Sequence, residues 1–243
     1  MKTRAWHRTL GAWSFLPIVF ICLQYSWIYM IPAFAIYIAI ALTVTVGYHR
    51  LFSHAAFECN RAWHWLFGMI GTISLNSSPV HWASVHMAHH KFSDTEDDPY
   101  DASWGHFLRF KDRDNITATR NVVKMMRDPM HKFFMDYSLT LSIIAGLVIL
   151  GFFGTEAFLF LYALPISAYL VTAGLHTIYA HGPTGIRNLW LLEILIPMAG
   201  EWIHKEHHTH PKMAKFNTKP YYLDLGGVLI GVIENGRESS TST

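Results

Sequence analysis

Forty consecutive residues near the amino terminus, from Thr9 to Tyr48, contain no Asp, Glu, Lys or Arg. A helix needs about 20 apolar residues to cross a lipid bilayer, so this stretch has the length of two crossings. Because Pro32 lies near its middle, we expect a hairpin of two spans, over residues 10–30 and 33–50. A cleaved signal peptide is the alternative, but the stretch is too long for one and lacks a small-residue cleavage site before its second apolar half.

A second uncharged stretch runs from Tyr137 to Ile186 and is interrupted only by Glu156. It predicts a second hairpin, with spans over residues 134–153 and 157–180. Residues 62–80 also lack charge, but their strongly apolar part covers only 13 residues, 63–75, which favours a buried or interfacial helix over a crossing. We expect an amphipathic surface helix over residues 186–200 and a short apolar helix over residues 225–234.

The charged residues outside these stretches predict how the protein is oriented. Only 15% of the residues are charged, against about a quarter in soluble proteins. With four spans, all 19 Lys and Arg residues fall on the side that holds residues 1–8, 47–133 and 186–243, and the positive-inside rule makes that side cytoplasmic. The prediction is an all-α integral membrane protein, one domain over residues 1–243, with four transmembrane helices in two hairpins. Both termini and a helical cap, residues 51–133 and 186–243, would lie in the cytoplasm.

Histidines are concentrated in three short segments, HRLFSH (residues 49–54), HMAHH (86–90) and HKEHH (204–208). In the last two, the histidines at positions i, i+3 and i+4 lie on one face of a helix. Ser78 is a suitable N-cap, and Pro79 a suitable first residue, for the helix that carries the second segment. The spacing of the two histidines in the first segment does not suit a regular helix, so we expect the chain to unwind where the second span ends.

Eight histidines in these segments are too many for one tetrahedral zinc ion and would suit two metal ions with four or five ligands each. His176, near the cytoplasmic end of the fourth span, would join them, although a hydrogen-bonded core histidine is the alternative. Imidazole ligates several transition metals, so the histidines do not identify the metal. Ligating histidines need acceptors for their second nitrogen. The carboxylates beside the histidine segments that could accept these hydrogen bonds are Asp94, Glu96, Asp97, Asp98 and Glu206. The alternative is that the acidic residues after the second segment only form a solvated loop. The remaining histidines, including His181 and His210, fit no segment and are expected at the surface, at the membrane interface or behind the ligands.

The segments HRLFSH, HMAHHKFSDTEDDP and GEWIHKEHH strongly resemble those of the membrane fatty acyl desaturases of the stearoyl-CoA desaturase type. The resemblance covers about residues 30–230, including LDLGG at residues 223–227. It implies a cytoplasm-facing centre of two iron ions. The implied ligands are His49, His54, His86, His89, His90, His176, His204, His207 and His208. It also implies removal of hydrogen from a saturated long-chain acyl group near its middle (delta-9 type), using O2 and two electrons from a separate donor such as a ferredoxin or a b-type cytochrome.

The sequence departs from the pattern of that family at several positions. Met87 replaces an Arg that is usual inside the second segment, and Ser84 and Val85 replace an Arg–Asp pair that helps to hold the CoA head group in the animal enzymes. The sequence therefore does not identify the carrier of the acyl group, which could be CoA, a glycerolipid or an acyl carrier protein. Thr172 occupies a position where the family often has an Asn that contacts iron through a water molecule. The candidates for contacts behind the ligands are Thr172, Asp94 and Glu206.

A bent apolar tunnel would hold the acyl chain beside the metal, and Trp82, Trp104 and Trp202 are candidates to line it. Alternatively, these residues belong to the core or to the aromatic belts of the membrane interface. The same metal chemistry with insertion of oxygen would give a hydroxylase or ketolase, which the histidines alone do not distinguish. A metal transporter would place ligands along the spans, and a zinc hydrolase would use about three protein ligands. No basic run or recognition motif indicates nucleic acid, whereas membrane lipids are the expected surroundings.

Overall fold

The computed structural model describes residues 6–100, 102–104, 117–181 and 185–241. Every regular element within these ranges is a helix, and no strand occurs in them. The all-helical class predicted from the sequence is therefore confirmed for the described part of the chain.

The amino-terminal hairpin turns earlier than expected. Helix α1 (Trp6–Cys22) is followed by a turn and a short 3-10 helix, η1 (Trp27–Tyr29). Helix α2 (Met30–Leu42) then continues into η2 (Thr43–Ser53), so that residues 27–53 form one long apolar rod. Pro32 does not interrupt this rod because it lies in the first turn of α2, where an N–H would have no partner within the helix. The turn expected near Pro32 lies at residues 23–26 instead.

The second part of this rod, η2, is a π-helix. The backbone N–H of His54 donates to the carbonyl of His49 at 3.2 Å, which is a bond from residue i+5 to residue i. Because a π-helix has more residues in each turn than an α-helix, side chains five positions apart share a face. The sequence predicted that the chain unwinds at the first histidine segment. The chain instead stays helical there and widens into a π-helix.

Helix α3 (Arg61–Ile73) packs closely on η2. Its N-cap is Asn60, whose side chain accepts two backbone N–H groups of the first turn. A Cβ atom at Gly47 of η2 would lie 2.4 Å from Phe67, and one at Gly71 of α3 would lie 2.3 Å from Tyr48. The two helices can approach this closely because neither glycine carries a side chain.

Helix α4 (Pro79–Phe92) carries the second histidine segment and begins as predicted. Ser78 is the N-cap, and its hydroxyl accepts the backbone N–H of His81 at 3.3 Å. The short basic helix α6 (Arg120–Arg127) follows later in the chain, and Thr119 is its N-cap.

Helices α7 (Pro129–Phe158), η3 (Leu159–Ala163) and α8 (Leu164–Ala180) form one helical stretch of 52 residues that turns back at Gly154. Gly154 has a φ of +83°, which glycine adopts readily because it has no Cβ atom. The Tyr162 hydroxyl donates to the carbonyl of Ser142 at 2.6 Å and joins the two arms. The turn lies between the two helical segments expected from the sequence.

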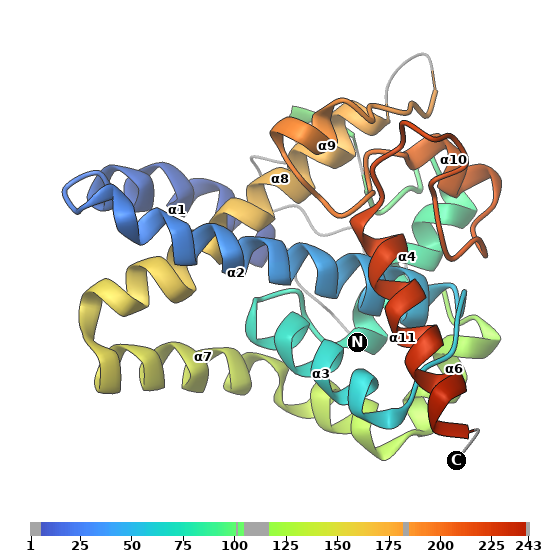
Figure 1. Ribbon diagram of the computed structural model, residues 1–243, viewed down its shortest axis with the longest axis horizontal. Coiled ribbons are helices and arrows are strands. Elements are labelled where there is room, and N and C mark those ends of the chain that lie inside the picture. The colour runs from blue at the N-terminus through green and yellow to red at the C-terminus, as the bar shows by residue number, and fades with distance from the viewer. Residues whose placement is uncertain (1–5, 101, 105–116, 182–184, 242–243) are drawn as a thin grey trace.

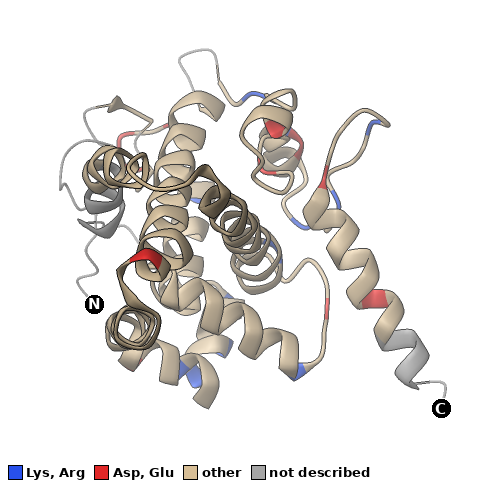
Figure 2. Ribbon diagram, turned by 60° about the vertical axis from the view of Figure 1, so that its left-hand side comes forward, with Lys and Arg blue, Asp and Glu red and all other residues tan. Residues whose placement is uncertain are grey.

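The outer surface of these helices is apolar. Ile143, Leu147 and Phe152 of α7 are 53%, 61% and 82% exposed, and soluble proteins rarely expose so continuous an apolar surface. Two helical stretches, residues 27–53 and 129–180, are long and apolar enough to cross a membrane. Figure 2 shows long stretches of helix without charged residues, which gather in loops and near helix ends. These features favour association with a membrane.

The carboxy-terminal part contains three helices, α9 (Leu192–Leu195), α10 (His204–Thr209) and α11 (Leu225–Thr241). The amphipathic helix expected over residues 186–200 is not formed; only the four residues of α9 are helical there. Leu189 N–H instead donates to the carbonyl of Trp202 at 2.8 Å, so the segment folds back on itself. Figure 1 shows α4 and α10 toward one end of the molecule, whereas α1 and the turn within α7 lie toward the other.

Candidate metal centre

Nine histidines form two clusters in which the nearest ring nitrogens lie within 4.8 Å of one another. The five-histidine cluster consists of His49, His54, His86, His90 and His207. The four-histidine cluster consists of His89, His181, His204 and His208. Eight of these nine residues come from the three histidine segments of the sequence, and they are all that those segments contain.

Local helix geometry explains how the segments share their histidines between two clusters. In η2, His49 and His54 are five residues apart and point to the same cluster because the π-helix places them on one face. In α4, the residues at i and i+4 join the five-histidine cluster, and the residue at i+3 joins the other. In α10 the distribution is reversed: the residue at i+3, His207, joins the five-histidine cluster, and the residues at i and i+4 join the other.

The ring nitrogens within each cluster face one another. In the five-histidine cluster, Nε2 of His207 lies 2.8 Å from Nε2 of His49 and 2.8 Å from Nε2 of His90. In the four-histidine cluster, Nε2 of His204 lies 2.7 Å from Nε2 of His181 and 3.0 Å from Nε2 of His208. Each cluster therefore directs several Nε2 atoms at one point.

Three carboxylates accept hydrogen bonds from the opposite side of the rings. Glu201 accepts from Nδ1 of His49 at 2.7 Å. The loop after α4 supplies the other two, because Asp98 accepts from Nδ1 of His89 at 2.9 Å and Asp94 accepts from Nδ1 of His181 at 3.0 Å. A ring that donates through Nδ1–H has a lone pair on Nε2, which is the form that ligates a metal.

These contacts test whether the clusters suit metal ions. Nε2 of His49 carries a lone pair and faces Nε2 of His207, which also faces His90, so one proton cannot satisfy all three atoms. Nδ1 of His204 and of His207 are buried and lack hydrogen-bond partners among the described residues. A cation at the centre of each cluster would satisfy the facing lone pairs together, and a set of imidazoles suits iron among other transition metals.

Burial keeps these imidazoles neutral. It lowers the pKa of His86, His204 and His207 well below the usual value, and that of His90 to about 2, because a charged ring would lose its hydration. Burial also raises the pKa of Glu201 to about 7, while the nearby positive charge of Arg50 acts in the opposite direction. Neutral rings are required for metal binding.

The structure groups His181, and not His176, with the histidines of the three segments. His176 lies beside the four-histidine cluster but outside both clusters, and its Nε2–H donates to the carbonyl of Glu201 at 2.9 Å. A carbonyl oxygen only accepts, so this nitrogen carries a proton and has no lone pair for a metal. His181, which fitted no segment, stands at the end of α8 and completes the four-histidine cluster.

Of the candidate acceptors, Asp94 and Asp98 contact clustered histidines, whereas Thr172 and Glu206 do not. The Thr172 hydroxyl donates to the carbonyl of Tyr169 at 3.0 Å and accepts from Tyr37 at 3.2 Å. Glu206 uses its backbone N–H to donate to Asn188, and no hydrogen bond joins its carboxylate to a described histidine.

The three candidate tunnel tryptophans occupy different surroundings. Trp82 stacks on His86, with ring centroids 4.8 Å apart. Trp202 is buried against His176, with ring centroids 5.0 Å apart, and donates its indole N–H to the carbonyl of Ile196. Trp104 is 49% exposed and contacts Tyr179 at the edge of its ring. Of the three, only Trp82 stacks on a histidine of either cluster.

A cavity of about 60 Å³ adjoins both clusters. His49 and His86 of one cluster and His89, His181 and His204 of the other reach its wall. The rest of the wall is mainly apolar and includes Val44, Trp82, Leu170, Ala173 and Met198. The cavity is therefore a short, mainly apolar space with a histidine cluster on either side.

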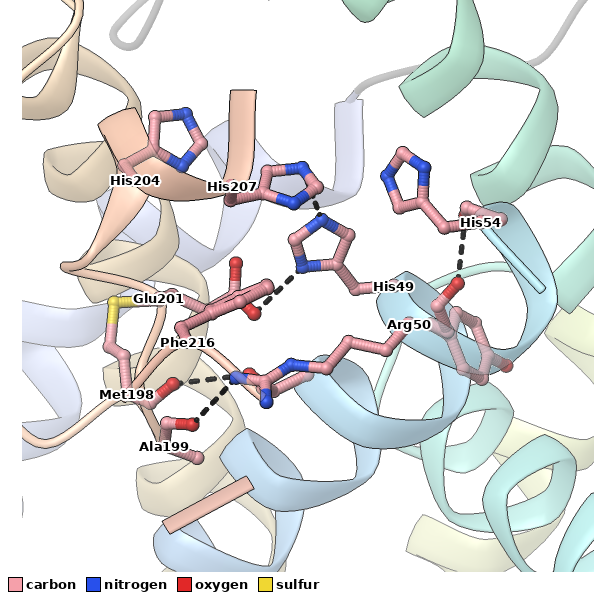
Figure 3. Close-up of polar contacts among 12 residues, drawn as sticks. His49, Arg50, His54, Met198, Ala199, Glu201, His204, His207 and Phe216 are labelled. Atoms are coloured by element: carbon pink, nitrogen blue, oxygen red, sulfur yellow. Dashed lines mark hydrogen bonds and ion pairs between the residues drawn. The ribbon is translucent and has the colours of Figure 1, made fainter. Parts of the chain in front are cut away.

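A buried ion pair that the sequence analysis missed supports the five-histidine cluster. Arg50, next to His49, donates to both carboxylate oxygens of Asp224 at 2.8 and 3.0 Å, and both side chains are almost inaccessible. Arg50 also donates to the carbonyl of Ala199, and its guanidinium lies over the ring of Phe216. Figure 3 shows Arg50 reaching the segment before Glu201, while Glu201 and His207 contact His49 on the other side. A charged residue next to an apolar span was the available signal for this role.

The chain is similar in sequence to several characterised lipid desaturases. It is 31% identical over 198 residues to the sn-2 palmitoyl-lipid 9-desaturase of Nostoc sp. (strain 36), covering 72% of this chain and 67% of the relative. It is 26% identical over 230 residues to the sn-1 stearoyl-lipid 9-desaturase of Anabaena variabilis, covering 88% and 84% of the two chains. The delta-9 acyl-lipid desaturase 1 of Arabidopsis thaliana is 24% identical over 258 residues, covering 96% and 83%. No protein-family model matches the chain.

Proposed function

The chain belongs to the membrane fatty acyl desaturase family, and on that basis we propose that its two histidine clusters each hold one iron ion and that it desaturates lipid-bound acyl chains at a delta-9 position. The observation that carries this proposal is the pair of clusters facing one apolar cavity. As a desaturase it is an oxidoreductase, and the relatives' names, which specify palmitoyl- and stearoyl-lipid, support a glycerolipid carrier.

We propose as ligands the nine clustered histidines, with His181 in the place expected for His176. When bound, iron supplies the activation of O2 and an oxidant strong enough for an unactivated C–H bond, with electrons from a separate donor such as a ferredoxin or a b-type cytochrome. Glu201, Asp98 and Asp94 fix the rings that they contact, so that Nε2 of each ring stays directed at the metal position.

The cavity wall positions the acyl chain. At about 60 Å³ the cavity accommodates a short length of chain and not a whole acyl group. The apolar side chains of Val44, Leu170 and Met198 exclude water from this space, while the ring of Trp82 borders both the chain and His86. Holding two adjacent methylene groups against the histidine centre accounts for a defined double-bond position, because reactivity depends on orientation.

A glycerolipid fits this site better than acyl-CoA. At the position where the animal enzymes hold CoA phosphates with an Arg–Asp pair, Ser84 is buried and donates its hydroxyl to the carbonyl of Val80 at 2.8 Å. Charge-assisted hydrogen bonds to phosphate are the strong ones, and neither Ser84 nor Val85 supplies one. We therefore expect lipid-bound acyl groups to be better substrates than acyl-CoA.

We further propose four membrane spans and a cytoplasmic active site. The two long apolar stretches, the reversal at Gly154 and the absence of Lys and Arg from residues 134–180 support the second hairpin. Helix α1 contributes the apolar segment Trp13–Cys22, which supports the first. A reporter fused after Thr243 should be cytoplasmic and one inserted at Gly154 external; a cytoplasmic reporter at Gly154 would contradict this topology.

Expression in a host that lacks its own desaturase tests the function directly. We expect monounsaturated acyl chains in the membrane lipids of that host, detected by lipid profiling, and two iron ions per purified chain. His210→Ala is the matched control, because His210 is exposed and lies outside both clusters. Hydroxylated chains in place of unsaturated ones would contradict desaturation, and a single zinc ion would contradict the metal centre.

A further inference from the structure

A second pocket, of about 540 Å³, lies on the other face of α8 from the histidine cavity. None of the clustered histidines lines it. Leu175 and Tyr179 of α8 form one wall, and the segment from Arg187 to Leu192 forms the opposite wall. Its volume lies in the range of about 300–1,000 Å³ that is typical of small-ligand sites.

The pocket contains one cationic side chain, Arg187, for which no described residue serves as a partner. Nε of Arg187 is buried, and among the described residues none hydrogen-bonds to it and none forms an ion pair with the guanidinium. An arginine stays charged at any physiological pH and presents several N–H donors suited to phosphate or carboxylate oxygens. Because this half-buried guanidinium lines the pocket without a described carboxylate beside it, the site favours an anionic group from outside the protein.

The rim of the pocket is suited to a lipid. Leu191, Ile194 and Leu195, in and next to α9, are 58%, 66% and 76% exposed and form an apolar edge beside the pocket. Tyr179 lies one residue before the end of α8, and aromatic residues are typical of the membrane interface. An anionic group bound to Arg187 would therefore be accompanied by apolar surface on both sides.

We propose that this pocket binds the phosphate of a glycerophospholipid, with one acyl chain along Leu175 and Tyr179. This placement rests on the membrane orientation proposed above, in which the end of α8 lies at the cytoplasmic surface. The pocket wall also contacts the histidine centre indirectly, because the side-chain carbonyl of Asn188 accepts the backbone N–H of Lys205 at 2.8 Å, at the start of α10. A bound lipid thus stabilises the start of α10, which carries the third histidine segment.

Native mass spectrometry of the purified, delipidated protein tests the site. The probes are dioleoylphosphatidylglycerol and dioleoylglycerol, which has the same acyl chains without phosphate. We expect one phosphatidylglycerol per chain, and an affinity roughly 10-fold or more lower for Arg187→Gln, because Gln cannot form the charge-assisted hydrogen bonds that Arg makes with phosphate. Lys132→Gln, which removes an exposed cation at the start of α7, should bind like the wild type.

Several outcomes would overturn the proposal. They are equal binding of phosphatidylglycerol by the wild type and Arg187→Gln, equal binding of both probes, an equal loss in Lys132→Gln, or displacement of the lipid by excess inorganic phosphate alone. If Arg187→Gln fails to fold, Leu175→Trp tests the same pocket by filling it and should also weaken binding. Binding is measured without turnover, so loss of this site in an active desaturase, or an intact site in an inactive protein, separates this inference from the proposed function.

Discussion

The two histidine clusters share helices α4 and α10 but rest on different supports. The five-histidine cluster includes two residues of the buried η2 and is supported by Glu201 and by the Arg50–Asp224 ion pair. The four-histidine cluster is supported by Asp98 and Asp94, which lie in the charged loop after α4, and the Asp94 side chain is 37% exposed. One metal position is therefore held by the protein core and the other largely by a loop near the surface.

This difference suggests how the centre loads and loses metal. A loop with few buried apolar contacts opens at a lower free-energy cost than a core helix. We therefore expect the four-histidine cluster to exchange its metal first, while the five-histidine cluster keeps its geometry. The second and third histidine segments each contribute to both clusters, so the two positions are still coupled through α4 and α10.

The largest expected effect follows from removing one ligand from each cluster. His207→Ala and His89→Ala should each abolish product, and each should lower the bound iron from two ions to about one. Both proteins should remain in the membrane, because apolar burial and not the metal stabilises the spans. Lipid profiling and metal analysis of the purified variants measure these effects, with His210→Ala as the control. Substantial product from either variant would contradict the ligand set.

The exchange of His176 and His181 gives the next test. His181→Ala should behave like a ligand variant and lose the metal of the four-histidine cluster. His176→Ala should keep both metals, because it loses only a hydrogen bond to the Glu201 carbonyl, worth about 1 kcal/mol, and some packing. Metal analysis of the two variants side by side decides between them. Two ions in His181→Ala and one in His176→Ala would restore the assignment expected from the sequence.

The support of the five-histidine cluster is tested by its buried ion pair. Asp224→Ala leaves the Arg50 charge buried without its partner, which should lower the free energy of unfolding by about 3–5 kcal/mol. It also removes an acceptor for the backbone N–H groups of Phe216 and Gly227. Thermal unfolding in detergent measures the loss. Combining Arg50→Met with Asp224→Leu removes both charges and should cost less than Asp224→Ala; an equal cost would show that the ion pair is not the main support.

The sequence predicted much of this centre because helical spacing is a local property. The start of α4 at Ser78 and Pro79 and the all-helical class follow from capping rules and from uncharged length. The turn at Gly154 also falls where the uncharged stretch is interrupted.

Features that depend on tertiary contacts were not predictable in the same way. No residue spacing in the sequence predicts that η2 forms a π-helix. No sequence motif surrounds His181, so the sequence did not indicate that it lies in a histidine cluster. The amphipathic pattern of residues 186–200 indicated a helix, but Pro197 lacks an N–H, and Ala199 and Gly200 have φ values of +59° and +103°. The loop geometry is stabilised instead by contacts with Trp202 and Arg50.

The smallest expected effect compares the two carboxylates of the loop after α4. Asp98 is buried and accepts both from His89 and from the backbone N–H of Asp94 and Tyr100, so Asp98→Asn should weaken metal binding by about 10- to 100-fold. Asp94→Asn should have a smaller effect, because the side chain is 37% exposed and water can replace part of its hydrogen bond to His181. Titrating each variant with a chelator, while its iron content is followed, gives the loss of metal affinity in each variant and the ratio of the two losses.

We expect the four-histidine cluster to empty first in both variants, and Mössbauer spectroscopy should show one iron signal fading before the other. Simultaneous loss of both signals would mean that the two positions share one support, and that the contrast between core and loop does not govern metal retention.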